Sequence, residues 1–218
     1  MQISWNGFGS FTIAAKSTIG DVTLVTNPFS REDGPKFPRA LAASIVVQSH
    51  LSNDTDNLAA ITPEYAEDKR SPFIVSHAGE FEVRGLAVTG VHTPKKDGTP
   101  HTIYRFDVEG MSLGFLGALD RALTDQEVEL LGNIDVLIVP SGGVDVLAAS
   151  AAAEVIAQIE PRLIIPSYVS AESAVSPYAE VSALCREISC LVEIVTKFKL
   201  TRAALPEEDM KIVTLARG

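Results

Sequence analysis

Residues 43–57 read ASIVVQSHLSNDTDN. The first part, as far as Gln48, is a short apolar run typical of a buried strand. The second part is so rich in side-chain hydrogen-bond acceptors that it predicts a loop or a helix N-cap, with a short helix after it. Because active sites concentrate on loops that a rigid sheet positions, this stretch points to both the sheet and the functional site.

Short strand-like runs lie on both sides of this stretch. Before it, three runs that alternate apolar and small polar residues, separated by glycine-containing turns, predict strands over residues 2–5, 10–14 and 22–26. After it, further strands are expected over residues 73–76, 81–84, 86–91, 102–108 and 111–116. The last two runs are joined by Glu109-Gly110, which predicts a hairpin.

Helices and strands alternate after Leu119. Thr124-Asp125-Gln126-Glu127 is a capping box and predicts a helix through about Leu131. The pattern then predicts a buried strand over 136–139, a helix over 147–158, a strand over 163–165, a helix over 177–188, and strands over 191–195 and 211–215.

Two strand-rich halves, each followed by helices, predict an α/β (α+β) fold. Two sheets pack face to face, helices cover the outsides, and residues 1–218 form a single domain. A three-layer, doubly wound sheet is the weaker alternative, because the first half has many hairpin-length connections and few crossover helices.

Composition narrows the classes of protein. The chain has 218 residues, 46% of them hydrophobic, and a formal net charge of −10, which disfavours nucleic acid as a partner. We expect no membrane span and a cytoplasmic location, because the sequence holds neither a long apolar segment nor a signal peptide. Cys185 and Cys190 match neither a zinc nor a redox spacing and are expected to be reduced core residues.

Histidine and aspartate stand out in the polar loop. The chain contains no phosphate-binding loop, nucleophile elbow or H-E-x-x-H motif. His50 and Asp54 are four residues apart, so they could share a metal ion. Structural roles are the favoured alternative, with Asp54 capping a helix and His50 bonding to loop carbonyls.

The order of motifs resembles that of the metallo-β-lactamase superfamily, in particular small hydrolases related to ascorbate-6-phosphate lactonase. The resemblance runs from Ile3 to about Val169 and includes Asn27-Pro28-Phe29, Leu116-Gly117-Ala118 and Ile164-Ile165-Pro166. It implies a four-layer αββα sandwich with a dinuclear metal site at the edge of the sheets.

The resemblance also implies that most metal ligands are absent. The family's H-x-H-x-D-H motif falls on residues 50–55, where only His50 and Asp54 remain. Ser52 and Thr55 stand at the other two ligand positions of this motif, Ala118 at that of a bridging aspartate, and Tyr168 at that of the last ligand histidine. Phe8 replaces the histidine of the family's opening turn, and Asn27 replaces the aspartate of its D-P-F motif. His101 lies where many members carry a ligand histidine. Phe8 and Phe115 are expected to place rings near the former metal pocket.

These replacements predict a non-catalytic protein without a metal ion, serving as a scaffold, an oligomer subunit or a binder of a small polar ligand. The predicted residual pocket comprises His50, Asp54, His101, Asn27, Ser52, Thr55 and Tyr168. The alternative is a hydrolase with one zinc or manganese ion at His50, Asp54 and His101, or with His50 and Asp54 as a metal-free base pair. Homo-oligomers are expected because relatives often form them.

Overall fold

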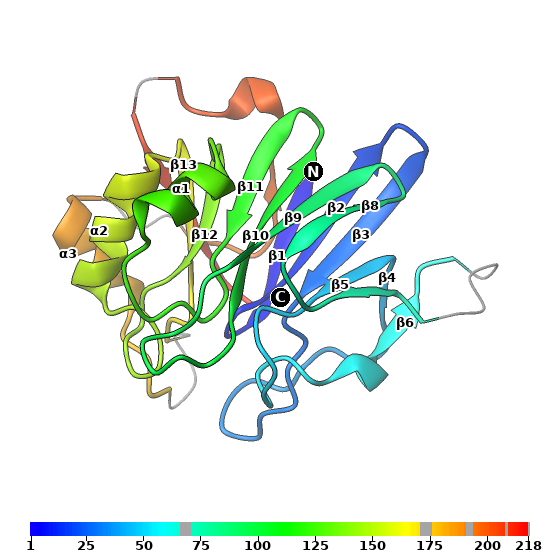
Figure 1. Ribbon diagram of the computed structural model, residues 1–218, viewed down its shortest axis with the longest axis horizontal. Coiled ribbons are helices and arrows are strands. Elements are labelled where there is room, and N and C mark those ends of the chain that lie inside the picture. The colour runs from blue at the N-terminus through cyan, green and yellow to red at the C-terminus, as the bar shows by residue number, and fades with distance from the viewer. Residues whose placement is uncertain (66–70, 171–175, 191–193, 208, 218) are drawn as a thin grey trace.

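Two twisted sheets lie face to face in the computed structural model, which describes residues 1–65, 71–170, 176–190, 194–207 and 209–217 (Figure 1). The six-stranded sheet has the order β15-β1-β2-β3-β5-β7. Its strands are β1 (Gln2–Gly7), β2 (Ser10–Ser17), β3 (Gly20–Thr26), β5 (Ile45–Val47), β7 (Phe73–Val75) and β15 (Phe198–Lys199).

The second sheet has seven strands in the order β16-β13-β12-β11-β10-β9-β8. They are β8 (Gly79–Val83), β9 (Leu86–His92), β10 (Thr102–Val108), β11 (Met111–Phe115), β12 (Val136–Pro140), β13 (Leu163–Ser167) and β16 (Lys211–Ile212). Two short ribbons pair β4 (Leu41–Ala43) with β6 (Ile61–Pro63) and β14 (Ile194–Val195) with β17 (Thr214–Leu215).

The main core lies between the sheets and continues under the helices. Alternation along the strands decides which side chains enter it: Leu24 and Ile45 belong to this core, whereas their neighbours Val25 and Val46 point to the other face. There Val25 and Val46 pack against Ala43 and Ile61, so the β4–β6 ribbon covers the outside of the six-stranded sheet.

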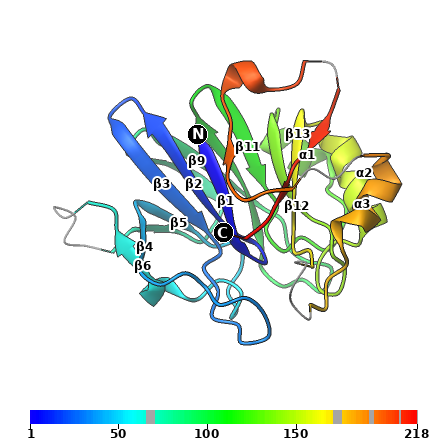
Figure 2. The ribbon, with the colours of Figure 1, turned by 180° about the vertical axis from the view of Figure 1, so that it is seen from behind.

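Three helices lie beside the seven-stranded sheet (Figures 1 and 2). They are α1 (Asp125–Leu131), α2 (Ala149–Ile159) and α3 (Val181–Ile188). Every residue of β12 and β13 is buried, as expected for parallel strands covered on both faces. The predicted α/β sandwich of two face-to-face sheets is therefore confirmed.

Local sequence signals correspond closely to the structure. The Thr124 hydroxyl accepts a hydrogen bond from the Glu127 amide, and the Glu127 carboxylate accepts one from the Thr124 amide, which completes the predicted capping box. In the β10–β11 hairpin, Glu109 and Gly110 both have positive φ values, 52° and 71°, as a two-residue turn requires.

Four expectations need adjustment. The apolar run 43–48 does not form one strand, because the chain leaves the β4–β6 ribbon at Ser44 before it enters β5. The helix expected over 177–188 begins only at Val181, and the short helix after the polar loop is the 3₁₀ helix η1 (Leu58–Ala60). Of the strand expected over 191–195, residues 191–193 lie outside the described part, and β14 forms the remainder.

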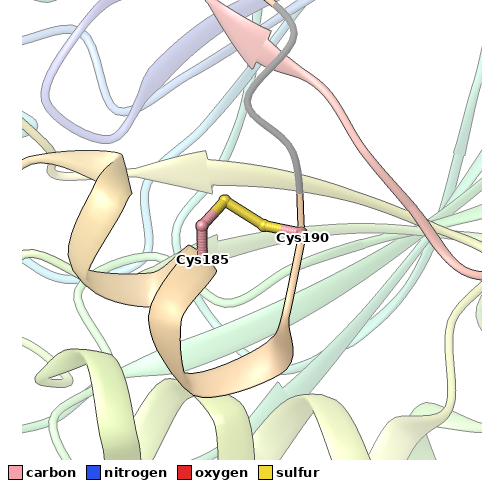
Figure 3. The surroundings of a disulfide bond; sticks show 2 residues. All are labelled: Cys185 and Cys190. Carbon is pink, nitrogen blue, oxygen red and sulfur yellow. A yellow bond between two sulfur atoms is a disulfide. The ribbon is translucent and has the colours of Figure 1, made fainter.

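The cysteines are joined, so the prediction that they are reduced is wrong (Figure 3). Ser189 ends α3 in the left-handed conformation, with φ of 55°, and the Cys190 amide donates to the Cys185 carbonyl at 3.1 Å. This helix-terminating turn brings residues five apart together, and their Cα atoms lie 4.7 Å from each other. In the described part of the chain, no helix is long and apolar enough to cross a membrane.

Candidate functional site

Loops from both sheets line an open cleft of about 1050 Å³. The loop after β3 contributes Arg31 and Asp33, the loop after β5 contributes His50 and Asp54, and Lys95 comes from the loop after β9. The polar loop singled out in the sequence therefore does form one wall of a cleft.

Asp54 forms an ion pair and does not cap a helix. Its Oδ1 accepts a hydrogen bond from Nη1 of Arg31 at 3.0 Å, and the two side chains are only 15% and 14% exposed. The N-cap residue of η1 is Asn57, and it makes no side-chain capping hydrogen bond. Asp54 is thus committed to a cation supplied by the protein itself.

Arg31 is held on several sides. Its Nε donates to Asp33 at 2.8 Å, its Nη2 also contacts Asp33, and its Nη1 donates to the Tyr178 hydroxyl at 3.0 Å. The guanidinium carbon lies 4.6 Å from the ring centroid of Phe8, which is a cation–π contact. Hydrogen bonding to Asp33, together with the charge of Asp54, raises the pKa of Arg31.

His50 is a buried, neutral imidazole at the edge of this ion pair. Its Nε2 lies 3.9 Å from Oδ2 of Asp54, and its Nδ1 lies 2.9 Å from the hydroxyl of Ser49. Burial lowers the pKa of His50 to about 4, although the charge of Asp54 opposes the shift. Asn27 fixes Ser49, because its side chain donates to the Ser49 hydroxyl at 2.9 Å and accepts from the Ser49 amide at 2.8 Å.

Ser49, His50 and Asp54 superficially resemble a nucleophile, base and acid. However, Ser49 is only 2% exposed, and a Cβ atom at Gly117 would lie 2.3 Å from the Ser49 Cβ. A substrate carbonyl has no room to approach this hydroxyl, so the group orients His50 and does not provide a nucleophile.

Both ring nitrogens of His101 are used within the protein. The Ala118 amide N–H donates to Nε2 at 3.1 Å, which makes Nε2 an acceptor, and Nδ1 lies 3.2 Å from the Thr93 carbonyl, to which it donates. Burial, with the nearby His50 as a smaller cause, lowers the pKa of His101 to about 3. The ring centroids of His101 and His50 are 6.0 Å apart.

The remaining predicted pocket residues divide into two groups. Thr55 donates to the His50 carbonyl at 2.6 Å, and Ser52 accepts from the Asp54 amide at 3.1 Å, so both tie the loop together. Tyr168 is fully buried, and among the described residues its hydroxyl has no well-formed hydrogen bond. Ser52 therefore lines the cleft, whereas Thr55 and Tyr168 are fully buried and do not line it.

An aromatic cluster fills the space below the ion pair. It comprises Phe8, Phe29, Ala118, Val146, Tyr168 and Tyr178. Phe8 meets Phe29 edge to face at 4.8 Å, as predicted for a ring placed near the pocket. The same prediction is wrong for Phe115, which lies in the main core and stacks on Phe106, because it occupies an inward position of β11.

Residues 2–168 match the family described as a beta-lactamase superfamily domain. The chain belongs to the metallo-β-lactamase superfamily. A Thermotoga maritima protein described as a candidate Zn-dependent hydrolase of this superfamily is similar over 99% of both chains, with 26% identity and a TM-score of 0.78.

Two more distant structures share the metallo-β-lactamase fold alone. The metallo hydrolase Igni18 from Ignicoccus hospitalis is 14% identical over 92% of this chain and 99% of its own, with a TM-score of 0.64. The metallo-beta-lactamase fold protein YhfI from Bacillus subtilis is 9% identical over 100% and 97%, with a TM-score of 0.62. No curated protein sequence matches the chain.

The residues present do not fit the metal centre that the metallo-β-lactamase family implies. Nowhere in the described ranges do three His, Cys, Asp or Glu side chains gather so that they could hold an ion. His101 is closed by the Ala118 amide, and Asp54 is bound to Arg31. The geometry therefore supports neither a dinuclear centre nor a joint site formed by His50, Asp54 and His101.

The sequence did not single out Arg31, Ser49 or Tyr178. A signal existed for Arg31, since it opens the charged loop that follows Asn27-Pro28-Phe29. Ser49 directly precedes the histidine of the motif, so its position offered a weaker signal. Nothing local marks Tyr178, which reaches Arg31 across 147 positions of sequence.

Proposed function

We propose that this chain is a non-catalytic member of the metallo-β-lactamase superfamily that has lost metal-dependent hydrolysis. The observation that carries the proposal is the hydrogen bond from the Ala118 amide to Nε2 of His101. Hydrolysis in this manner needs an ion held by three or more donors with one open position for water. A histidine whose two nitrogens are both hydrogen-bonded offers no donor.

The other candidate groups support the same proposal. His50 is neutral and hydrogen-bonded to Ser49, and its nearest carboxylate, Asp54, is neutralised by Arg31. A carboxylate paired with a guanidinium is a poor partner for a general base, because its charge is already compensated. The metal-free base pair is therefore a weaker reading of the site.

We further propose that the cleft holds a small polar ligand, in preference to a purely structural role as a scaffold. Charged and polar side chains dominate its lining. Two apolar side chains stand exposed at its rim, Leu51 at 80% and Val144 at 65%. Val144 has φ of 63°, a costly conformation for a β-branched residue, and such strain clusters at binding sites.

The second candidate is a hydrolase with one zinc or manganese ion. It is favoured by the similarity, over nearly the whole chain, to the Thermotoga maritima protein. The description of that protein names zinc. In this reading His101 would have to break its hydrogen bond to the Ala118 amide to bind the ion together with His50 and Asp54.

Metal analysis of protein purified without chelators separates the two functions. We expect far less than one equivalent of zinc, manganese or iron per chain, and no hydrolysis of phosphodiester, lactone or β-lactam substrates after metal is added. Nitrogen NMR shifts of His101 should show protonated Nδ1 and acceptor Nε2, unchanged by added Zn²⁺. Near-stoichiometric metal that disappears in Asp54→Ala would overturn the proposal.

Association with a second copy is also proposed. The last strand of the six-stranded sheet, β7, exposes Phe73 and Ile74 at 47% and 38%. Among the described residues β7 pairs with β5 alone, and apolar side chains on such an edge favour association, since edge strands present free backbone groups. Light scattering should give a mass above that of one chain, and Phe73→Lys should lower it; a monomer at all concentrations would contradict this.

A further inference from the structure

One guanidinium stands beside the carboxylate that the metallo-β-lactamase motif retains. Arg31 and Asp54 are both largely buried, and a buried charge is tolerated only when it is paired. The Arg31 guanidinium meets two carboxylates, a tyrosine hydroxyl and an aromatic face, so four sides of this cation are matched by acceptors or π electrons. These surroundings stabilise a cation that stays in place.

We propose that Arg31 takes the electrostatic place of a metal ion in this cleft. Its guanidinium neutralises Asp54, and while it is there a dication beside Asp54 and His50 meets a like charge within a few ångströms. The inference rests on the proposed non-catalytic function and adds its cause: metal is excluded by an internal cation as well as by missing ligands.

Phe8 connects the Arg31 guanidinium to a replaced motif position. It stands at the position of the histidine in the family's opening turn, and its ring now lies under the guanidinium at 4.6 Å. Gly34, in the same loop as Arg31, is needed for this arrangement, because a Cβ atom there would lie 2.3 Å from the Phe8 ring. The lost ligand and the internal cation are thus parts of one packed unit.

Removing the guanidinium leaves a recognisable donor set. Asp33 binds the Nε and Nη2 edge of the guanidinium, whereas Asp54 binds Nη1, so only Asp54 lies on the side of the motif histidine. Oδ2 of Asp54 lies 3.9 Å from Nε2 of His50, and without the guanidinium these two side chains leave one uncompensated carboxylate beside one imidazole, with further positions open to water. This combination suits zinc or manganese. We therefore predict that the protein, which binds no metal ion while Arg31 is in place, gains a metal site through one substitution.

The experiment is titration of the full-length chain with Zn²⁺ alone, followed by calorimetry. Wild type should show no saturable binding at the cleft. Arg31→Ala should gain one saturable site, at least about tenfold tighter than any binding by wild type. The gain should vanish in the double variant Arg31→Ala/Asp54→Asn and should be smaller in Arg31→Lys, which keeps the charge.

Arg105→Ala is the matched control. Arg105 also binds a carboxylate, that of Asp107, at 2.9 Å, but its strand position on β10 is outside the cleft lining. This variant should bind Zn²⁺ as wild type does. If Arg31→Ala does not unfold cooperatively, Arg31→Gln replaces it, because glutamine keeps hydrogen-bond donors without the charge.

The outcomes separate the two proposals. Wild type that already holds a stoichiometric ion overturns the proposed function and this inference together. Metal-free wild type whose folded Arg31→Ala or Arg31→Gln variant gains no binding overturns the inference alone. Gain that persists after Asp54→Asn also overturns it, since the new site would then lie elsewhere.

Discussion

Mild acid should destabilise this protein well before its carboxylates protonate. Burial lowers the pKa of His50 to about 4 and of His101 to about 3, from 6.5. The unfolded chain therefore binds more protons below pH 6.5, and stability, complete above that pH, falls as the pH drops toward the folded-state values. Between about pH 7.5 and pH 5, each histidine lowers the free energy of unfolding by about 2 kcal/mol, so the two together lower it by about 4 kcal/mol.

Urea denaturation followed by Trp5 fluorescence measures this loss. Trp5 is the single tryptophan and is buried, so unfolding changes its surroundings. The variant His101→Gln should halve the loss, because an amide can donate to Thr93 and accept from Ala118 without titrating in this range. The exposed His92 provides the control, and His92→Gln should leave the pH dependence unchanged.

Two results would refute the reasoning. The first is a change in unfolding free energy below about 1 kcal/mol over that pH interval, because two buried neutral histidines cannot produce so little. The second is an NMR titration that places the pKa of His50 or His101 near 6.5. Acidic groups do not confuse the test, since the lowered pKa of Glu127 contributes a loss only below the ordinary carboxylate range.

Two smaller predictions concern the disulfide and the glycines with positive φ. Replacing Cys190 with Ser should lower the unfolding free energy in urea by about 2 kcal/mol, the loop entropy expected for so short a ring, and an unchanged midpoint would refute it. A cytoplasmic location would reduce the bond and produce the same loss. Gly117→Ala should cost about 2–4 kcal/mol, from its φ of +55° and the clash with Ser49 and His101. Gly98→Ala, with φ of +85° and open space around it, should cost clearly less, and equal costs would contradict the packing argument.

Much of the fold could be predicted because its signals are local. The buried strand β12 is a continuous apolar run, and the capping box at Thr124 needs only four residues. The apolar run 43–48 was harder to divide, because both β4 and β5 are apolar and the turn at Ser44 has no glycine or proline. Such a break depends on pairing with the distant strand β6.

The residues of the site could be predicted only where a single motif position determines which residue lies there. The motif pointed to His50 and Asp54, which line the cleft, whereas Asn27 is buried behind Ser49 and the Arg31–Asp54 pair joins residues 23 positions apart in two loops. The disulfide was missed for a related reason, since it depends on the left-handed residue Ser189, which is neither glycine nor asparagine. Which side chains in different loops contact each other depends on where the folded backbone places those loops.

The replacements in the metallo-β-lactamase motif are physically coupled and form an alternative packing. Where the resemblance places a bridging aspartate, Ala118 supplies no carboxylate, and its backbone amide donates to Nε2 of His101, so this one position lacks a ligand and also satisfies the imidazole. Phe8 stands where the resemblance places the histidine of the opening turn, and its ring face contacts the Arg31 guanidinium. Restoring a single ligand would leave the guanidinium and the aromatic cluster in place. If the proposed metal exclusion holds, it depends on this set of mutually satisfied groups, and substitution of Arg31 tests it most directly.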